Sequence, residues 1–597
     1  MNLSNSHIPP ISWTLLGLIS FFIFLFLGRD AFHGSEAYLA EKAREMLITG
    51  DYFHSYNNFC LQGYTSLINT WLILPLQKFL EPSEFIIRLP GAIFALSSIA
   101  GIIVLGKQLY SNRSALLASW MFISTYGFII SARTASFDSV SLSASLWALV
   151  TYFYNEEQRN FFKSLLFWIL IFLCAASSNL IPAIITLAIL LPRIIRKKWF
   201  FSSIFSIRNI LAFFLGSLIF ITPLILHYGF DEEYNTKFSL ETFKDINFIL
   251  DIIKQNLTEI LNYFKHINLN YYFNKNIFSI FRILLPWAPL IFVSTYYILA
   301  KKSKYPNITF DLLKGSLLGW LIFILSAQNH WDFCVLLLPI IILPTAQFLA
   351  SFEEEFTTKN KYPKLLSIII DIYYYLAIFI SAVFLSSIFM ISLWHSFLGT
   401  TLPKMPLFSV PIAGAITLFV IRLDWQEAPN PLTILSSIPR KLSAIFIGYS
   451  LLMITTWSVL LPGLTELRTK KTFFISLHEK LKNYESNDIY FFNTTVEPAF
   501  LYYLNIEEPV FSSNCPNTHK RSLIDFISEN RGKNIVIVCN DKPITLSYLD
   551  AELKKLKITN KDISLKEEPI IGKNIIHKKN QKWRAYFITV PKEDSSK

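Results

Sequence analysis

Apolar segments recur along most of this chain and are separated by short polar segments. A spanning helix needs about 20 predominantly apolar residues, and segments of roughly this length recur as far as residue 462. The pattern predicts thirteen spanning helices, at residues 11–28, 87–107, 114–132, 138–154, 161–176, 178–193, 209–227, 278–299, 311–327, 333–350, 365–393, 406–422 and 442–462. A shorter apolar segment at 67–80 predicts an interfacial or re-entrant helix.

The segment at 28–71 follows the first apolar run and is too polar to continue through a bilayer. Alanine and leucine recur in it at helical spacing until Gly50 ends the pattern. This spacing predicts a short amphipathic helix laid along the membrane surface. Asp30, Ser35 and Glu36 lie at or before its start. We therefore expect this segment to bind a polar group.

From about residue 470 the composition becomes that of a soluble domain. The pattern predicts strands at 488–493, 534–540 and 583–590 and helices at 476–484, 497–504 and 546–556. Alternating strands and helices indicate a small α/β domain. We therefore divide the chain into a transmembrane domain, residues 1–465, and a soluble α/β domain, residues 466–597.

Composition supports a polytopic α-helical membrane protein. Of the 597 residues, 53% are hydrophobic and 16% are charged, whereas ordinary soluble domains carry about a quarter charged residues. The net charge of +12 fits basic residues that hold cytoplasmic loops in place, so we predict no nucleic-acid partner. The five cysteines show neither metal-ligand spacing nor a CxxC pair.

Lysine and arginine in the short loops predict the orientation. They gather in one set of loops, at 107–113, 159–163, 193–198, 301–304, 359–364 and 422–441. The opposite side holds the outer loop at 29–86, the long loop at 228–277 and everything after residue 463. We therefore predict a cytoplasmic N-terminus with a retained first span and an extracytoplasmic C-terminal domain.

Polar residues at the outward ends of the spans are the candidates for chemistry. Asp138 begins a predicted span close to Arg133, where it either takes part in function or simply caps a helix. Glu36 has the same two interpretations. Arg88 and Arg133 either snorkel to the interface or bind a phosphate, whose geometry arginine matches bidentately. The sequence contains no P-loop, no GxGxxG and no HExxH.

Residues 88–142, which begin RLPGAIFALSSIAG and end SARTASFDSVSL, closely resemble the core of the polyprenyl-phosphate-dependent glycosyltransferases of the GT-C type. EAYLAEKAREMLITGDY at 36–52 resembles the first outer loop of the same superfamily. The most similar group is that of the lipid A aminoarabinose transferases and protein O-mannosyltransferases. The resemblance implies a GT-C-like fold in a bacterial inner membrane, with the C-terminal domain in the periplasm.

The catalytic motifs of this family are altered here. Aligned without gaps, the essential Asp of the family's Asp-Glu pair falls on Ser35 and its Glu on Glu36. The family's Phe-Glu-Lys-Pro-Pro motif is not retained, and Tyr64 stands at its Glu. The family's Glu-His-x-x-Arg-Phe best matches residues 233–238, where Lys237 replaces the Arg. Three residues match family positions: Arg88, Arg133 and Asp138.

By this resemblance, an acceptor oxygen attacks the anomeric carbon of a sugar–phosphate–polyprenol, and cations stabilise the lipid phosphate that leaves. We assign the acidic roles to Glu36 and Asp138, with Asp30 as a substitute for the missing Asp. Arg88 and Arg133 would face the lipid phosphate. The other predicted substrate-binding residues are Ser35, Tyr64 and Lys237.

Three functions stay open at this point. The chain would transfer a sugar to lipid A or a related surface glycolipid, or transfer one to a protein or another glycan. The third alternative is a non-catalytic member, or a lipid-binding or transport-like protein. The predicted partners are a polyprenyl-phosphate-linked sugar donor, a glycolipid or protein acceptor, and membrane lipids. No cofactor is identified: two carboxylates would suit a divalent metal, but no ligand cluster in the sequence requires one.

Overall fold

The computed structural model describes most of the chain in two compact units. The first unit comprises residues 1–27, 66–69 and 88–460, and the second comprises 28–65, 70–87 and 461–597. The described residues are 10–32, 35–62, 66–80, 82–135, 138–155, 160–197, 206–229, 278–301, 303, 305–325, 331–359, 364–398, 409–425, 440–460, 471–482, 484–493, 496–512, 521–540, 549, 551–552, 563–564 and 583–590. Most of the outer loop predicted at 228–277 lies outside this set.

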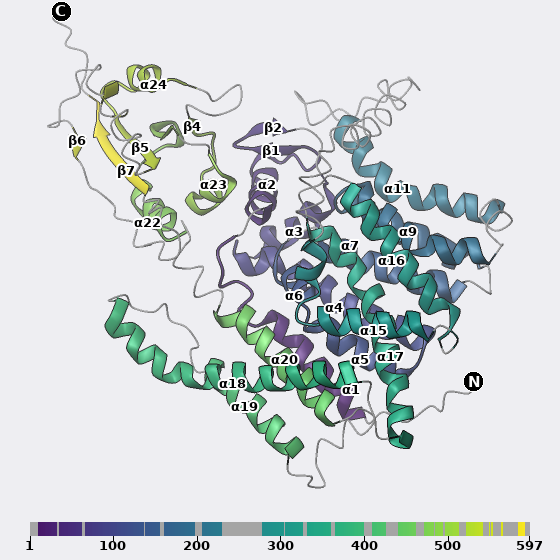
Figure 1. Ribbon diagram of the computed structural model, residues 1–597. Helices are drawn as coiled ribbons and strands as arrows, with labels where there is room; N and C mark the ends of the chain where they lie inside the picture. The colour runs from purple at the N-terminus through teal and green to yellow at the C-terminus, as the bar shows by residue number, and fades with distance from the viewer. Residues whose placement is uncertain are drawn as a thin grey trace, which may run out of the picture. The chain divides into compact units, whose positions relative to one another are not determined.

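Helices and their connections make up the described part of the first unit (Figure 1). They are α1 Pro10–Phe21, η1 Phe22–Phe24, most of α4 Glu84–Leu109, α5 Asn112–Ile123, α6 Tyr126–Arg133, α7 Asp138–Asn155, α8 Phe161–Ala176, α9 Leu180–Arg196, α11 Ile207–Gly229, α15 Ala288–Ala300, α16 Asn307–Leu325, η3 Trp331–Leu337, α17 Leu338–Lys359, α18 Lys364–Leu398, α19 Ser409–Trp425, α20 Arg440–Thr455 and η5 Thr456–Leu460. Polar residues in the short connections cap the N-termini of several of these helices. The side chains of Ser111, Asn160 and Asn179 accept backbone N–H bonds at the starts of α5, α8 and α9.

Within the described residues, five helical segments are long and apolar enough to cross a membrane, or six if the bent pair α5 and α6 forms one span. The five are Glu84–Leu109, Ile207–His227, Asn307–Leu325, Cys334–Ser351 and Leu365–Ser387. Shorter apolar helices accompany them, among them α8 and α15. The chain is therefore a multi-pass membrane protein, while the total of thirteen spans stays a prediction.

The segment predicted as one continuous helix at 114–132 is broken instead. Helices α5 and α6 meet at an angle of 66° because two hydroxyls at the break compete with the backbone. The Ser124 hydroxyl donates to the Trp120 carbonyl (2.7 Å) and accepts from Trp287 Nε1 (2.9 Å). Thr125 then caps α6 by accepting from the Phe128 N–H. The bend is thus built into the buried packing.

Helices α9 and α16 approach each other very closely. A Cβ added at Gly315 would lie 2.8 Å from the carbonyl carbon of Ile189 and 2.9 Å from its Cα. At one end of this contact Asp311 pairs with Arg193, with 3.5 Å between Nη1 and Oδ2, and also with Arg196. Only glycine lets the two backbones come this near.

The second unit combines the first polar segment with the C-terminal part of the chain. Its elements are α2 Ser35–Thr49, β1 Ser55–Asn57, β2 Cys60–Gln62, most of α3 Ile68–Phe79, α22 Lys471–Leu481, η6 Ser486–Asp488, β3 Ile489–Phe492, α23 Pro498–Leu504, β4 Phe511–Ser512, α24 Leu523–Glu529, β5 Asn534–Asn540, β6 Ile563–Ser564 and β7 Trp583–Thr589. Strands β1 and β2 form an antiparallel hairpin. The other five strands form one sheet in the order β4-β3-β5-β7-β6.

This sheet is mixed: β3 runs parallel to β4 and β5, whereas β7 runs antiparallel to β5 and β6. Alternate residues of β3 enter different cores, as the strand period of two requires. Phe491 packs with Phe474 of α22 and Phe500 of α23, whereas Tyr490 packs with Phe526 of α24. Helices therefore cover both faces of the sheet.

The three strands predicted in this region are confirmed as β3, β5 and β7. The two-residue strands β4 and β6 carry too little pattern to be found from sequence. The helix predicted at 497–504 is confirmed as α23, and the one predicted at 476–484 begins earlier, at Lys471. The helix predicted at 546–556 lies mostly outside the described residues.

Candidate functional site on the outer helix

Helix α2 is where the predicted amphipathic helix lies, but it is not a surface helix. Every residue from Glu36 to Met46 except Tyr38 is buried. Helix α23, from the far end of the chain, packs against α2 together with strand β1. Gln77 of α3 also donates to the Ala40 carbonyl (3.4 Å). The predicted helix is confirmed as α2, but most of its residues are buried, because a segment more than 400 residues away covers it. Its position along the membrane surface stays a prediction.

Five of the buried side chains of α2 are ionisable. The residues are Glu36, Glu41, Lys42, Arg44 and Glu45, and each is at most 6% exposed. Charged groups are rarely buried to this extent unless they are paired or hydrogen-bonded. Such groups are frequent at functional sites, where burial and neighbouring charges shift their protonation.

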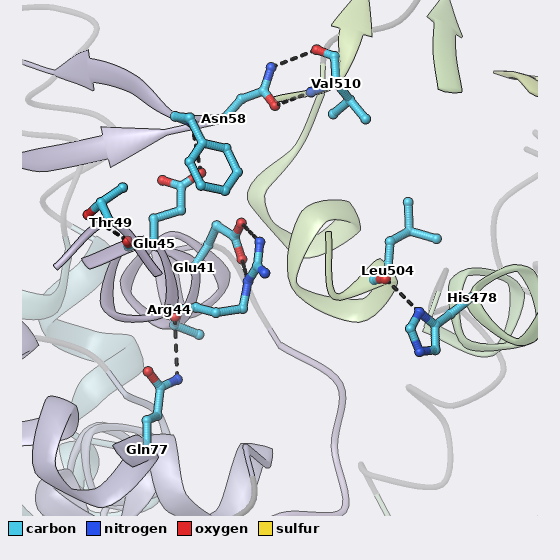
Figure 2. A network of polar contacts seen from close by, with 11 residues as sticks. Glu41, Arg44, Glu45, Thr49, Asn58, Gln77, His478, Leu504 and Val510 are labelled. Atoms are coloured by element: carbon cyan, nitrogen blue, oxygen red, sulfur yellow. Dashed lines mark hydrogen bonds and ion pairs between the residues drawn. The ribbon is translucent and has the colours of Figure 1, made fainter. Parts of the chain in front are cut away.

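Glu41 and Arg44 form a two-pronged ion pair on one side of α2 (Figure 2). Arg44 Nε donates to Glu41 Oε2 (2.8 Å), and Nη2 donates to Oε1 (2.6 Å). Burial raises the pKa of Glu41, and the guanidinium opposes that shift. The paired geometry is what allows two charges to stay inside the protein.

Glu45 and Lys42 titrate close to neutral pH. Burial, reinforced by the negative charge of Glu41, raises the pKa of Glu45 to about 8. Burial lowers the pKa of Lys42 to about 7. The Glu45 carboxylate accepts a backbone bond from the Phe59 N–H to Oε1 (3.0 Å). The helix thus holds an acid and a base whose charge states change within the physiological pH range.

Asp51 organises the turn after α2. Its Oδ1 accepts from the N–H groups of Phe53 (3.0 Å) and His54 (3.2 Å), and its Oδ2 lies 2.7 Å from His54 Nδ1 and 2.6 Å from the Tyr56 hydroxyl. Burial raises the pKa of Asp51, but the bonds from His54, Tyr56 and the Phe53 N–H, together with the charge of His54, lower it well below its usual range. The sequence pattern predicts only the end of a helix here. The i, i+3 spacing of Asp51 and His54 was the available signal.

The predicted residues at the head of α2 differ in their burial. Asp30 is partly buried, Ser35 is the exposed first residue of α2, and Glu36 is 2% exposed. Tyr64 and Lys237 lie outside the described residues.

Arg88 and Arg133, in the first unit, both bind the end of the first apolar run. Arg88 Nη1 donates to the Leu27 carbonyl (2.8 Å), and Arg133 Nη1 donates to the carbonyls of Ile23 (2.8 Å) and Leu25 (2.9 Å). Arg88 is buried and not at the surface. Both arginines therefore have a structural role, and binding of a lipid phosphate stays a prediction. Asp138 begins α7, five residues after Arg133.

Within the described ranges, no group of three or more His, Cys, Asp or Glu side chains is placed to hold a metal ion.

No family model matches the sequence, and no curated protein matches it. Solved structures do match. The crystal structure of ArnT from Cupriavidus metallidurans bound to undecaprenyl phosphate aligns with a TM-score of 0.64 over 96% of this chain and 97% of ArnT. The chain has the ArnT fold. The apo state of the same ArnT aligns with a TM-score of 0.62 over 97% of this chain and 98% of ArnT.

Sequence identity to ArnT is only 12% to 13%, so the fold is what this likeness establishes. The GT-C resemblance predicted from residues 88–142 and 36–52 is confirmed at the level of the fold. The likeness to ArnT covers both units, including the segments of the second unit that lie far apart in sequence.

Proposed function

We propose that this chain is a membrane glycosyltransferase that moves a sugar from a polyprenyl phosphate donor to lipid A or a related surface glycolipid. The observation that supports the proposal is the match over nearly the full length of both chains to ArnT bound to undecaprenyl phosphate. The buried charges of α2 are consistent with it, since the opening segment resembles the first outer loop of the GT-C enzymes.

In the proposed reaction an acceptor oxygen forms a bond to the anomeric carbon of the donor, and the bond from that carbon to the phosphate oxygen breaks. Polyprenyl phosphate leaves with the electron pair. If the acceptor is a hydroxyl, its proton passes to a carboxylate acting as general base. If the acceptor is a phosphate, it is already anionic and needs positioning more than a base.

We assign the acidic roles to Glu36 and Asp138, with Asp30 as the substitute for the Asp that Ser35 replaces. Arg88 and Arg133 are the candidates for the lipid phosphate, in addition to the carbonyls that they bind. Tyr64 and Lys237 are the remaining candidates for substrate binding. A divalent metal is not required by these assignments.

The proposed placement is the bacterial inner membrane, with thirteen spans, a cytoplasmic N-terminus and a periplasmic C-terminal α/β domain, residues 466–597. The concentration of basic residues in one set of short loops supports this orientation. It would place the polar head of α2 on the side where surface glycolipids are modified.

One observation favours a second function. Ser35 stands where the resembling enzymes carry an essential Asp, and serine cannot act as a carboxylate. The chain would then be a catalytically impaired member that binds a polyprenyl phosphate lipid. A protein or another glycan as acceptor is the third alternative.

The mass of intact lipid A from cells with and without the gene separates these functions. Loss of a hexosamine-type or pentose-type increment would support transfer to lipid A. Unchanged lipid A with altered glycoproteins would point to a protein acceptor. No change in either would support the non-catalytic function.

The variant Asp138→Asn tests the assigned mechanism in a sugar-transfer assay. We expect transfer to fall by about 100-fold or more, the usual contribution of a general base. Asp525→Asn is the matched control, because Asp525 is an exposed carboxylate in the first turn of α24. Undiminished transfer by Asp138→Asn would remove Asp138 from the mechanism. Recovery or gain of transfer in Ser35→Asp would identify Ser35 as the cause of any weak activity.

A further inference from the structure

The C-terminal α/β segment contacts the first outer segment at two separate points within the second unit. One contact joins Asn58 to Val510, which are 452 residues apart in sequence, and the other joins Phe32 to Tyr503, which are 471 residues apart. The two contacts lie on either side of α2 along the chain. Between them, α23 packs directly on the helix.

The first contact is a pair of hydrogen bonds between a side-chain amide and a backbone. Asn58 Nδ2 donates to the Val510 carbonyl (2.9 Å), and the Val510 N–H donates to Asn58 Oδ1 (3.0 Å) (Figure 2). The amide thus pairs with Val510 as a neighbouring strand would. Asn58 is 3% exposed and Val510 is fully buried, so water does not replace these bonds easily.

The turn that presents Asn58 also reaches α2. Asn58 and Phe59 have φ angles of 54° and 59° and connect β1 to β2 as a two-residue turn of the type that needs positive φ at both positions. Phe59 donates its N–H to Glu45 Oε1 (3.0 Å). One turn therefore joins Val510 of the C-terminal segment to Glu45 of α2.

The second contact fixes the chain just before α2. The Tyr503 hydroxyl accepts from the Phe32 N–H (3.0 Å) and donates to Glu84 Oε1 (3.1 Å). Glu84 also pairs with Lys471 of α22. The Phe32 ring stacks on the Tyr503 ring, with centroids 5.7 Å apart. Helix α23 is itself tied to α22, because His478 Nδ1 lies 2.6 Å from the Leu504 carbonyl.

We propose that Asn58 and Tyr503 are positioning residues, through which the C-terminal α/β segment holds α2, and with it Ser35 and Glu36, in the geometry that sugar transfer needs. The inference deepens the proposed function and rests on it for its catalytic part. Neither residue touches the reacting atoms. Their effect reaches the head of α2 through Glu45 and Phe32.

The variant Asn58→Gly tests this on the full-length protein in detergent or vesicles. Glycine adopts positive φ readily, so the turn keeps its backbone and loses only the amide. Loss of two hydrogen bonds should speed backbone hydrogen exchange in residues 35–49 by about 10- to 30-fold. Sugar transfer should lose kcat by a similar factor, with KM for the lipid donor little changed. Asn505→Gly is the matched control, because Asn505 is an exposed residue with φ of 50° at the end of α23.

A conservative variant separates positioning from general loss of stability. In Asn58→Asp the side chain can donate to the Val510 carbonyl only while its carboxyl is protonated. Exchange in residues 35–49, measured against wild type at the same pH, should therefore approach the wild-type rate as the pH falls toward the pKa of this carboxyl. Transfer by this variant should recover, relative to wild type, over the same range.

Unchanged exchange and unchanged kcat in Asn58→Gly would overturn the inference, as would equal effects in Asn505→Gly. The proposed function fails separately, through the absence of transfer by the wild-type protein. In that case faster exchange in Asn58→Gly would still establish the coupling of the C-terminal segment to α2, whereas unchanged exchange would exclude it.

Discussion

The charged side chains of α2 can be buried because they have partners on other turns of the helix and on other segments. Glu41 has Arg44 one turn away, and Glu45 has the Phe59 N–H in the following hairpin. The residues themselves, and the i, i+3 spacing of Glu41 and Arg44, can be taken directly from the sequence. Their burial cannot, because the α23 residues that exclude water are more than 450 positions away.

Replacing Arg44 by methionine should destabilise the protein strongly. The change leaves the Glu41 carboxylate buried without its partner, which costs about 3–5 kcal/mol. The midpoint of thermal unfolding in detergent measures the effect. The double variant Glu41→Gln with Arg44→Met should recover much of the loss. Arg521→Met, which breaks an exposed pair with Glu529, should cost at most about 1 kcal/mol. Equal shifts in the two methionine variants would contradict a buried pair.

Glu45 should make the stability of the protein depend on pH. Its pKa is 4.5 when unperturbed and about 8 in the folded protein, so the folded state binds the proton more tightly. The resulting stabilisation is complete below pH 4.5 and is lost as the pH rises through 8. Glu45→Gln should remove this loss, which amounts to about 3 kcal/mol at most by pH 7. Unfolding midpoints at pH 5 and pH 7 test the expectation.

The comparison should stay below pH 7, because Lys42 acts in the opposite sense above it. Its pKa falls from 10.5 to about 7 on folding, so the cost of burying the charged amine is relieved as the pH rises from 7 to 10.5. If wild type and Glu45→Gln lose stability equally between pH 5 and pH 7, Glu45 is not the group responsible.

At the scale of elements, the positions of helices and strands follow from periodicity, but their breaks and close approaches do not. The strands β3, β5 and β7 were predictable because each is a run of apolar and aromatic residues. The 66° bend between α5 and α6 was not, because Trp287, which bonds to Ser124 at the bend, precedes α15 and is more than 160 residues away in sequence.

The contact between α9 and α16 should not accept a methyl group. Gly315→Ala would place a Cβ against the backbone of Ile189, and overpacking of this kind costs about 1–3 kcal/mol. The unfolding midpoint should therefore fall. Gly17→Ala is the control within α1, where an added Cβ meets nothing within 4 Å, and it should be neutral or slightly stabilising. A neutral Gly315→Ala would show that the two helices can separate without cost.

At the scale of the whole molecule, orientation in the membrane is the main expectation that remains to be measured. An odd number of spans and the basic loops at 193–198 and 301–304 predict termini on opposite sides. Alkaline phosphatase fused after Lys597 should be active, because that enzyme needs an oxidising compartment. The same reporter placed in the loop at 193–198 should be inactive. Activity at both positions, or at neither, would contradict the predicted topology.

The sequence by itself determined that the chain is a multi-pass helical membrane protein with an α/β segment near its end. The length of an apolar run and the alternation along a strand are local properties, so the sequence shows them without any knowledge of tertiary contacts. The tertiary structure decided which groups are buried. The charged residues of α2 have the composition of a surface helix, and the packing of α23 and β1 makes the helix an interior one. Burial depends on residues distant in sequence. The pKa values of the buried groups and the coupling of α2 to the C-terminal segment therefore depend on those residues too.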